Sequence, residues 1–324
     1  MIKEQKYKFK KLKLDWDNFK SDSNNNSVRI RDAANQLSVS EAELLSTKIN
    51  EGVDYLKIDN YPSFFDQLFK VDKVMLLIRN DVVVHEKVIE ANSLIFSNNQ
   101  ILNKEENNFP ISTFNTDLFA HIFFEKKIHQ NKTLMSFQFF DYNGDSIIKI
   151  YLKGKDEKLF KDIAHSYVIK YNYQLQGLDK KNTNQDINND QIHLQILHNE
   201  KYALNKEYKL DQQLIRIILE TASKKKFPIQ IHAIGNNAIQ YHRDKVKNIM
   251  DFGPWINVID KKFNIHALEN QLSKNILSEY LSNDSKHYSI DFFDQSNNYI
   301  LGISPIKGYS KNFYSLIREL GLIE

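Results

Sequence analysis

The sequence predicts an α+β protein with an internal duplication: two similar halves, each with a large antiparallel sheet built from hairpins and flanking helices. Three observations lead to this class. The 324 residues are enough for about two domains. With 41% hydrophobic and 26% charged residues, the composition is that of a globular protein. Helices and hairpins also recur in the same order in both halves, without the alternation of strand and helix that indicates a parallel sheet.

The first half opens with short helices. Residues 28–45 have the pattern of two helices joined by a turn. Ser38 or Ser40 is the expected N-cap of the second helix, and Ser40 followed by Glu43 has the spacing of a capping box. Residues 61–69 predict another helix, because their apolar side chains fall on one side. The helix pair does not predict DNA binding, since its second helix is acidic and a recognition helix needs basic or amide side chains.

Two hairpins follow these helices. Residues 73–88 contain two β-branched runs around a turn at Asn80. Residues 134–152 contain two further strands with Asn-Gly at the tip, the strongest short signal for a hairpin. Residues 180–190 are almost devoid of apolar side chains and predict a linker.

The second half repeats this order. Residues 210–224 predict an amphipathic helix, with Leu210 as its first apolar position, and two hairpins follow it. Asn236 stands 156 residues after Asn80, and a Phe-Phe-Asp motif recurs at an offset of 153. Two anchors at nearly the same offset favour duplication. The expected organisation is an N-terminal repeat at 1–178 (helical entry 28–70, sheet hairpins 71–152), a linker at 179–190 and a C-terminal repeat at 191–324.

Composition excludes several classes of protein. The net charge is only +3, which argues against a tail-driven nucleic-acid binder. The basic N-terminus has no apolar core of signal-peptide length and no apolar run is long enough to span a bilayer, so we expect a cytoplasmic protein without membrane insertion. A membrane-surface helix over residues 8–13 is disfavoured, because the run is short and Asp15 and Asp17 follow it.

The chain has no cysteine and ten histidines, so histidine is the expected ligand for any iron. It has no glycine-rich phosphate loop and no serine-nucleophile motif. Each candidate histidine also has a structural interpretation: His85 lies in a strand, while His193 and His198 are five residues apart and cannot share one face. The structural interpretation of Lys307 is a solvent-exposed lysine in a loop. Together with many Phe and Tyr residues, the pattern allows one apolar, anionic ligand.

Four blocks of sequence occur in a familiar order: RIRDAANQLSVSEAELL, KVMLLIRNDVVVHEK, SFQFFDYNGDSIIKIYL and GPWINVIDKKFNIHALEN. They resemble the HemS/ChuS family of cytoplasmic haemin-utilisation proteins, from about residue 28 to the end of the chain. The resemblance implies two homologous α+β halves and a haem held in a cleft by a histidine on a helix. It also implies that the protein carries haem, or degrades it as an oxygenase and releases iron.

Carried over residue by residue, the resemblance indicates His193 as the axial haem ligand, with His198 second. His85 falls on a histidine of the N-terminal half that is associated with haem in some members. Lys307 falls near a family arginine and keeps its charge, so it would pair with a propionate. Phe119 falls where the family has an arginine, and this position has lost its charge.

The expected function is therefore a haem carrier, a haem-degrading factor supplied with electrons by an outside donor, or both. Enzymatic activity is left open. The alternatives are a diverged member that has lost haem ligation and binds another ligand or partner, and a structural or regulatory adaptor. Expected partners are haem and a haem-uptake transporter or reductase, with no nucleic acid, and the chain is expected to be a monomer or dimer.

Overall fold

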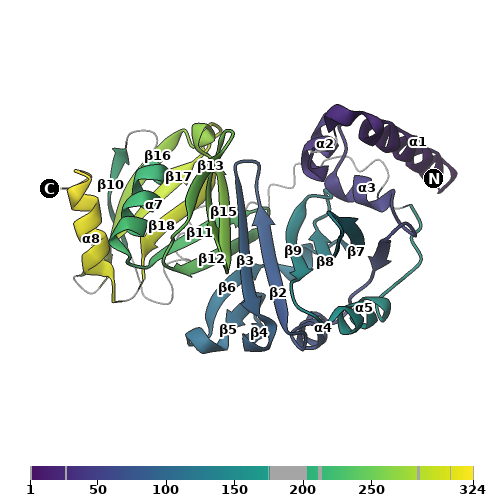
Figure 1. The fold of residues 1–324 in the computed structure, drawn as a ribbon, viewed down its shortest axis with the longest axis horizontal. Coiled ribbons are helices and arrows are strands. Elements are labelled where there is room, and N and C mark those ends of the chain that lie inside the picture. Colours follow the sequence, from purple (N-terminus) through teal and green to yellow (C-terminus); the bar gives the residue numbers. More distant parts are fainter. Residues whose placement is uncertain are drawn as a thin grey trace. The chain divides into compact units, whose positions relative to one another are not determined.

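The fold was analysed in a computed structural model, which describes residues 2–25, 28–173, 175, 203–210, 214–282, 285–306 and 308–323 (Figure 1). The chain forms two compact units. Unit 1 comprises Met1–Leu76, Ile89–Asn99 and Phe114–Asn182, and unit 2 comprises Leu77–Val88, Gln100–Thr113 and Thr183–Glu324. No helix in these described ranges is long and apolar enough to cross a membrane.

Seven α-helices lie within the described residues: α1 (Ile2–Ser21), α2 (Ile30–Gln36), α3 (Glu41–Ser46), α4 (Tyr61–Leu68), α5 (Glu157–His165), α7 (Leu214–Lys225) and α8 (Ser310–Glu319). The strands of the first half are β1 (Val53–Leu56), β2 (Lys73–Arg79), β3 (Val83–Glu90), β4 (Leu94–Ser97), β5 (Gln100–Asn103), β6 (Phe109–Phe114), β7 (His121–His129), β8 (Lys132–Phe140) and β9 (Ser146–Leu152). Those of the second half are β10 (Ala203–Leu210), β11 (Ile229–Gly235), β12 (Ala238–Asp244), β13 (Ile249–Phe252), β14 (Trp255–Asp260), β15 (Phe263–Leu268), β16 (Lys274–Ser282), β17 (Ser285–Phe293) and β18 (Tyr299–Pro305).

The strands form two nine-stranded sheets, which confirms the predicted α+β class. The first sheet has the order β1-β7-β8-β9-β2-β3-β15-β14-β13, and the second has the order β10-β16-β17-β18-β11-β12-β6-β5-β4. Each sheet thus contains six strands from one half of the sequence and three from the other. This exchange of strands explains why the compact units do not follow the sequence halves. The predicted repeat boundaries at 178 and 191 remain a prediction about the sequence repeats.

The predicted local elements of the first half are present. In the β2–β3 turn, Asn80 Oδ1 accepts hydrogen bonds from the amides of Val82 and Val83 at 2.8 and 2.6 Å. The β8–β9 turn has Gly144 at φ +77°, a left-handed conformation that favours glycine. These contacts are between residues close in sequence, and the sequence pattern therefore predicts them well.

The second half differs from the predicted elements at the start of its first helix. The helix predicted from Leu210 begins instead at Leu214, because Leu210 is the last residue of strand β10. The helix buries Leu214 and Ile218, whereas Ile217 stays largely exposed. The linker predicted at 180–190 lies outside the described residues.

The capping box of α3 is formed as predicted. Ser40 Oγ accepts from the amide of Glu43 at 3.2 Å, and the Glu43 carboxylate accepts from the amide of Ser40 at 2.9 Å. Both residues are buried. The box therefore satisfies amides at the start of the helix that would otherwise have no partner.

Replacing Ser40→Ala is expected to lower the free energy of unfolding by about 1 kcal/mol, because the cap of a buried helix start is lost. Urea unfolding monitored by circular dichroism measures the change. Ser63→Ala, on the exposed side of α4, is the matched control and should change stability by no more than about 0.5 kcal/mol. A Ser40→Ala variant as stable as this control would contradict the role assigned to the cap.

Candidate functional site

Of the four predicted site residues, the structure describes only His85. His193, His198 and Lys307 lie outside the described residues, so their roles stay predictions. Phe119, predicted at a former arginine position, is buried, and its ring centroid lies 4.7 Å from that of Phe139. Phe119 therefore belongs to an aromatic core contact.

His85 lies on β3 in unit 2, fully buried. Its Nδ1 accepts a hydrogen bond from Gln240 Nε2 at 2.8 Å, and Gln240 Oε1 accepts from Ser112 Oγ at 3.0 Å. The proton of the neutral ring is then on Nε2, which is buried without a hydrogen-bond partner. Burial, together with the charges of Lys87 and His232, lowers the pKa of His85 to about 3.

Two residues further along β3, Lys87 is also buried, and its Nζ donates to His242 Nδ1 at 3.2 Å. The His242 ring stacks on Phe263 with centroids 3.7 Å apart and planes 4° apart. Burial lowers the pKa of both Lys87 and His242. Alternation along a strand puts His85 and Lys87 on one face, a signal visible in the sequence. The partners Gln240 and His242 lie 155 residues away, and no local pattern indicates them.

A second buried network connects β11, β16, β17 and β18 in unit 2. Tyr299 Oη lies 2.6 Å from His232 Nε2 and donates to Asp291 at 3.0 Å. Asp291 also accepts from Ser278 and Ser289 at 2.7 and 2.6 Å. Three donors therefore satisfy a buried carboxylate. Burial and the adjacent Asp291 raise the pKa of Tyr299 well above its ordinary value, so the phenol stays protonated.

Gly302 makes this close approach possible. A Cβ at this position would lie 2.3 Å from Tyr299 Oη and 2.4 Å from His232 Cε1. Gly302→Ala is therefore expected to lower the free energy of unfolding by about 1–3 kcal/mol through overpacking. In the double variant with His232→Ala the loss should be smaller than the sum of the two single losses, because the ring is gone. Strictly additive losses in chemical denaturation would contradict this reading.

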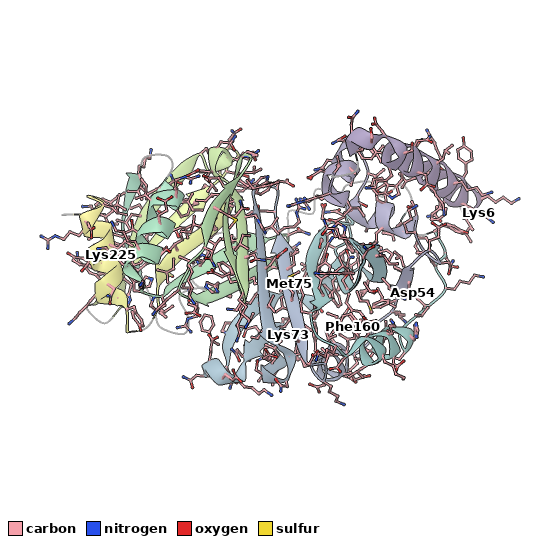
Figure 2. The ribbon with its side chains drawn as sticks, viewed as in Figure 1. Lys6, Asp54, Lys73, Met75, Phe160 and Lys225 are labelled. Carbon is pink, nitrogen blue, oxygen red and sulfur yellow. The ribbon has the colours of Figure 1, made fainter. Side chains whose placement is uncertain are left out.

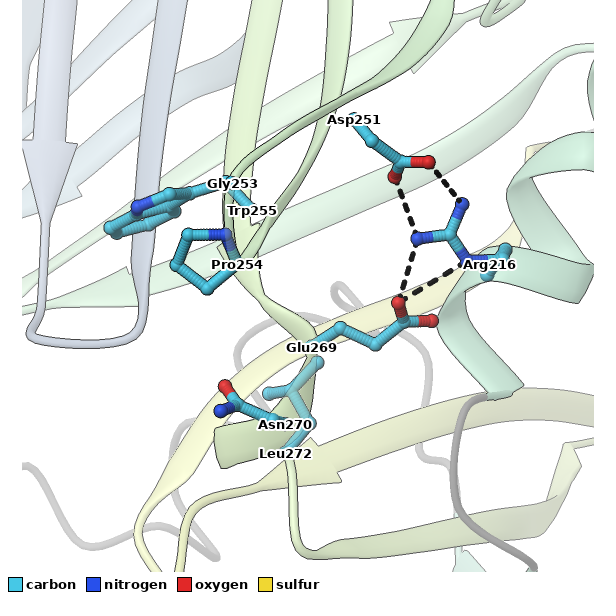
Figure 3. A pocket seen from close by; sticks show the side chains of 8 residues that line it. All are labelled: Arg216, Asp251, Gly253, Pro254, Trp255, Glu269, Asn270 and Leu272. Carbon is cyan, nitrogen blue, oxygen red and sulfur yellow. Dashed lines mark hydrogen bonds and ion pairs between the residues drawn. The ribbon is translucent and has the colours of Figure 1, made fainter.

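A cavity of about 530 Å³ lies at the first turn of α7 (Figure 3). Arg216 Nη2 contacts Asp251 at 2.7 Å and Glu269 at 2.8 Å. These ion pairs raise the pKa of Arg216. The remaining wall includes Pro254 and Trp255. Two carboxylates outweigh one guanidinium, so the cavity does not offer the free positive charge that a propionate would need.

Nor do the described residues supply a metal site. No group of three or more His, Asp or Glu side chains in this part of the chain is placed to hold a metal ion. A site for a haem iron needs only one axial side chain, and the carboxylate-rich cavity does not provide a histidine among its lining residues.

A sequence profile of the haemin-degrading HemS.ChuX domain family matches residues 38–167 and 193–311, and the chain belongs to this family. The two matched segments, one in each half, agree with the predicted duplication. Two curated relatives, the hemin transport proteins HemS of Yersinia enterocolitica and HmuS of Yersinia pestis, are each 20% identical over 288 residues, covering 81% of this chain and 83% of the relative.

Solved structures show the same fold over almost the whole chain. Holo-PhuS, a heme-binding protein from Pseudomonas aeruginosa, has a TM-score of 0.78 at 18% identity, covering 93% of this chain and 96% of PhuS. The heme degrading enzyme ChuS of Escherichia coli O157:H7 has a TM-score of 0.77 at 18% identity, covering 94% and 97%. The resemblance stated from four sequence blocks is thereby confirmed at the level of family and fold.

Proposed function

We propose that this chain binds haem and takes part in haem utilisation in the cytoplasm, as a haem carrier or as a factor in haem degradation that releases iron. Family membership across both halves is the observation that carries the proposal. The fold supports it, because a protein of the same fold over 93% of this chain is described as heme-binding. Haem itself would supply the redox chemistry, and the chain would supply binding, orientation and exclusion of water.

His193 and then His198 are the proposed axial ligands. The absence of cysteine leaves histidine as the expected donor. His85 is the alternative, and it is held neutral. Its Nε2 carries the ring proton while Nδ1 accepts from Gln240, so ligation through Nε2 would require the proton to move to Nδ1 and the Gln240 hydrogen bond to be lost. Its ring is sealed between strands, so the surrounding side chains would have to open before Nε2 reached an iron. That cost ranks His85 below the other two.

Haemin titrations of single variants test this ranking. His193→Ala or His198→Ala should weaken or shift the Soret band of the complex, while His85→Ala should leave ligation unchanged. His165→Ala, an exposed histidine on α5, is the matched control. If only His85→Ala abolishes the Soret shift, the ranking is wrong.

Carrier and degrader are separated by adding ascorbate in air to the haem complex. Bleaching of the Soret band, with release of iron to a ferrous chelator, indicates degradation. An unchanged Soret band indicates a carrier.

Lys307→Gln should weaken haemin binding without changing the axial ligand, because one point charge toward a propionate is lost.

A diverged member that has lost haem is the second candidate. The burial of Phe119 in the aromatic core favours it, because that position no longer offers a cation to a propionate. The Arg216 cavity does not replace the charge. An unmodified chain that shows no saturable Soret shift would favour this candidate over the first.

A further inference from the structure

Helix α1 carries a concentrated positive charge. It contains seven lysines against three carboxylates, and no arginine. Because the whole chain has a net charge of only +3, all residues outside α1 together carry a net charge of −1. The positive charge of this protein is therefore a property of one helix, which lies before the segments that match the family profile.

One face of α1 is packed and the opposite face is open. Leu12 and Trp16 are buried. At 100° per residue, the opposite face presents Tyr7 and Leu14, which are 70% and 60% exposed. Exposed lysines surround this apolar pair: Lys3, Lys6, Lys10 and Lys11. Figure 2 shows Lys6 near the N-terminal end of the helix.

The acidic residues do not cancel this face. In the sequence, the basic run at residues 8–13 is short, and Asp15 and Asp17 follow it. The helix is in fact 20 residues long. Asp17 accepts a hydrogen bond from Lys48 at 2.7 Å, and Glu4 pairs with Lys8 at 3.2 Å. The basic run is therefore part of a longer helix, and Asp17 and Glu4 each pair with a lysine.

We propose that the open face of α1 docks on a membrane surface rich in anionic lipid headgroups, with the helix parallel to the surface. Four or more lysines on a helix are attracted to such a surface, and apolar side chains at their centre can enter the headgroup boundary. Lipid is favoured over nucleic acid because two large apolar side chains occupy the middle of the face, where a phosphate backbone offers no apolar partner. Docking is peripheral and reversible, since no helix of the described chain can span a bilayer.

Sedimentation with vesicles tests the proposal on the full chain. The protein should bind phosphatidylcholine vesicles that contain phosphatidylglycerol, should not bind pure phosphatidylcholine, and should be released as salt is raised. The quadruple variant K3Q/K6Q/K10Q/K11Q should bind roughly 600-fold more weakly, because each of the four lysines near an anionic surface contributes roughly fivefold in affinity. Glutamine is a helix former comparable to lysine, so α1 should remain folded.

The matched control is K104Q/K132Q/K224Q/K245Q, which removes the same charge from exposed positions outside α1. It should retain most of the binding. Replacing Tyr7→Ser and Leu14→Ser together should reduce vesicle binding by roughly tenfold while preserving its dependence on salt.

Three results would overturn the proposal: equal binding to neutral vesicles, equal loss in both quadruple variants, or no release of the unmodified protein by salt. The same variants are measured against mixed-sequence duplex DNA by fluorescence anisotropy. Lysine-dependent binding to DNA without binding to anionic vesicles would make α1 a nucleic-acid surface and would overturn lipid docking. Each outcome is independent of whether the chain binds haem.

Discussion

Acidification from pH 7 to pH 5 is expected to lower the free energy of unfolding by about 4–6 kcal/mol, or about 2 kcal/mol for each of three buried histidines. Burial lowers the pKa of His85 to about 3 and that of His121 to about 4, and the pKa of His242 lies well below its ordinary value. In the folded protein these rings stay neutral over this range. In the unfolded chain they bind protons below about pH 6.5.

The sign follows from proton binding. Because the unfolded chain binds more protons than the folded chain between pH 6.5 and the lowered values, stability falls as the pH falls through that window. Urea unfolding at several pH values measures the slope. His121→Gln should reduce the slope by about one third, since one of three groups is removed. Ser63→Ala, which removes no titratable group, should leave the slope unchanged. Stability that is constant or increasing toward pH 5 would contradict this account.

Breaking the buried ion pair between Lys149 on β9 and Glu41 on α3 is expected to cost about 3–5 kcal/mol. The two side chains are only 8% and 2% exposed. Glu41→Leu leaves the Lys149 ammonium buried without its carboxylate, and the Phe140 ring 5.7 Å away only partly compensates it. The large cost therefore comes from an uncompensated charge and not from the strength of the pair.

A double-mutant cycle tests this reason. Glu41→Leu with Lys149→Met should be more stable than either single variant, because no charge is left buried. The exposed pair of Lys158 with Asp162, 2.5 Å apart on α5, is the control, and Lys158→Met should cost no more than about 0.5 kcal/mol. Additive losses in the buried cycle, measured by chemical denaturation, would contradict the argument.

The features of the fold that the sequence predicts correctly depend on residues that are close together in the chain. The α3 capping box and the β8–β9 turn depend on residues a few positions apart, and their residue types specify them. The exchange of three strands between the sheets depends on pairings such as β15 with β3, where Ile265 lies opposite His85. No pattern within a window of 20 residues contains that information.

The same distinction applies to the candidate site. The alternation of His85 and Lys87 is visible in β3, but their burial depends on Gln240 and His242 on a distant strand. Glu41 lies on the acidic second helix of the predicted pair, and only the structure shows it paired with Lys149 inside unit 1. The resemblance to a family predicted more of the fold than local patterns did, because its four blocks are spread along the chain and carry non-local information.

Titration of the unmodified chain with haemin tests the central claim most directly. The measurement follows the Soret band as haemin is added. The control variant His165→Ala, which changes an exposed histidine, is titrated in parallel. Haem binding predicts a saturable shift at one haemin per chain in both proteins, with an absorption spectrum typical of histidine-ligated iron. A linear, unsaturated increase identical to that of haemin added to a protein that does not bind it would contradict the claim.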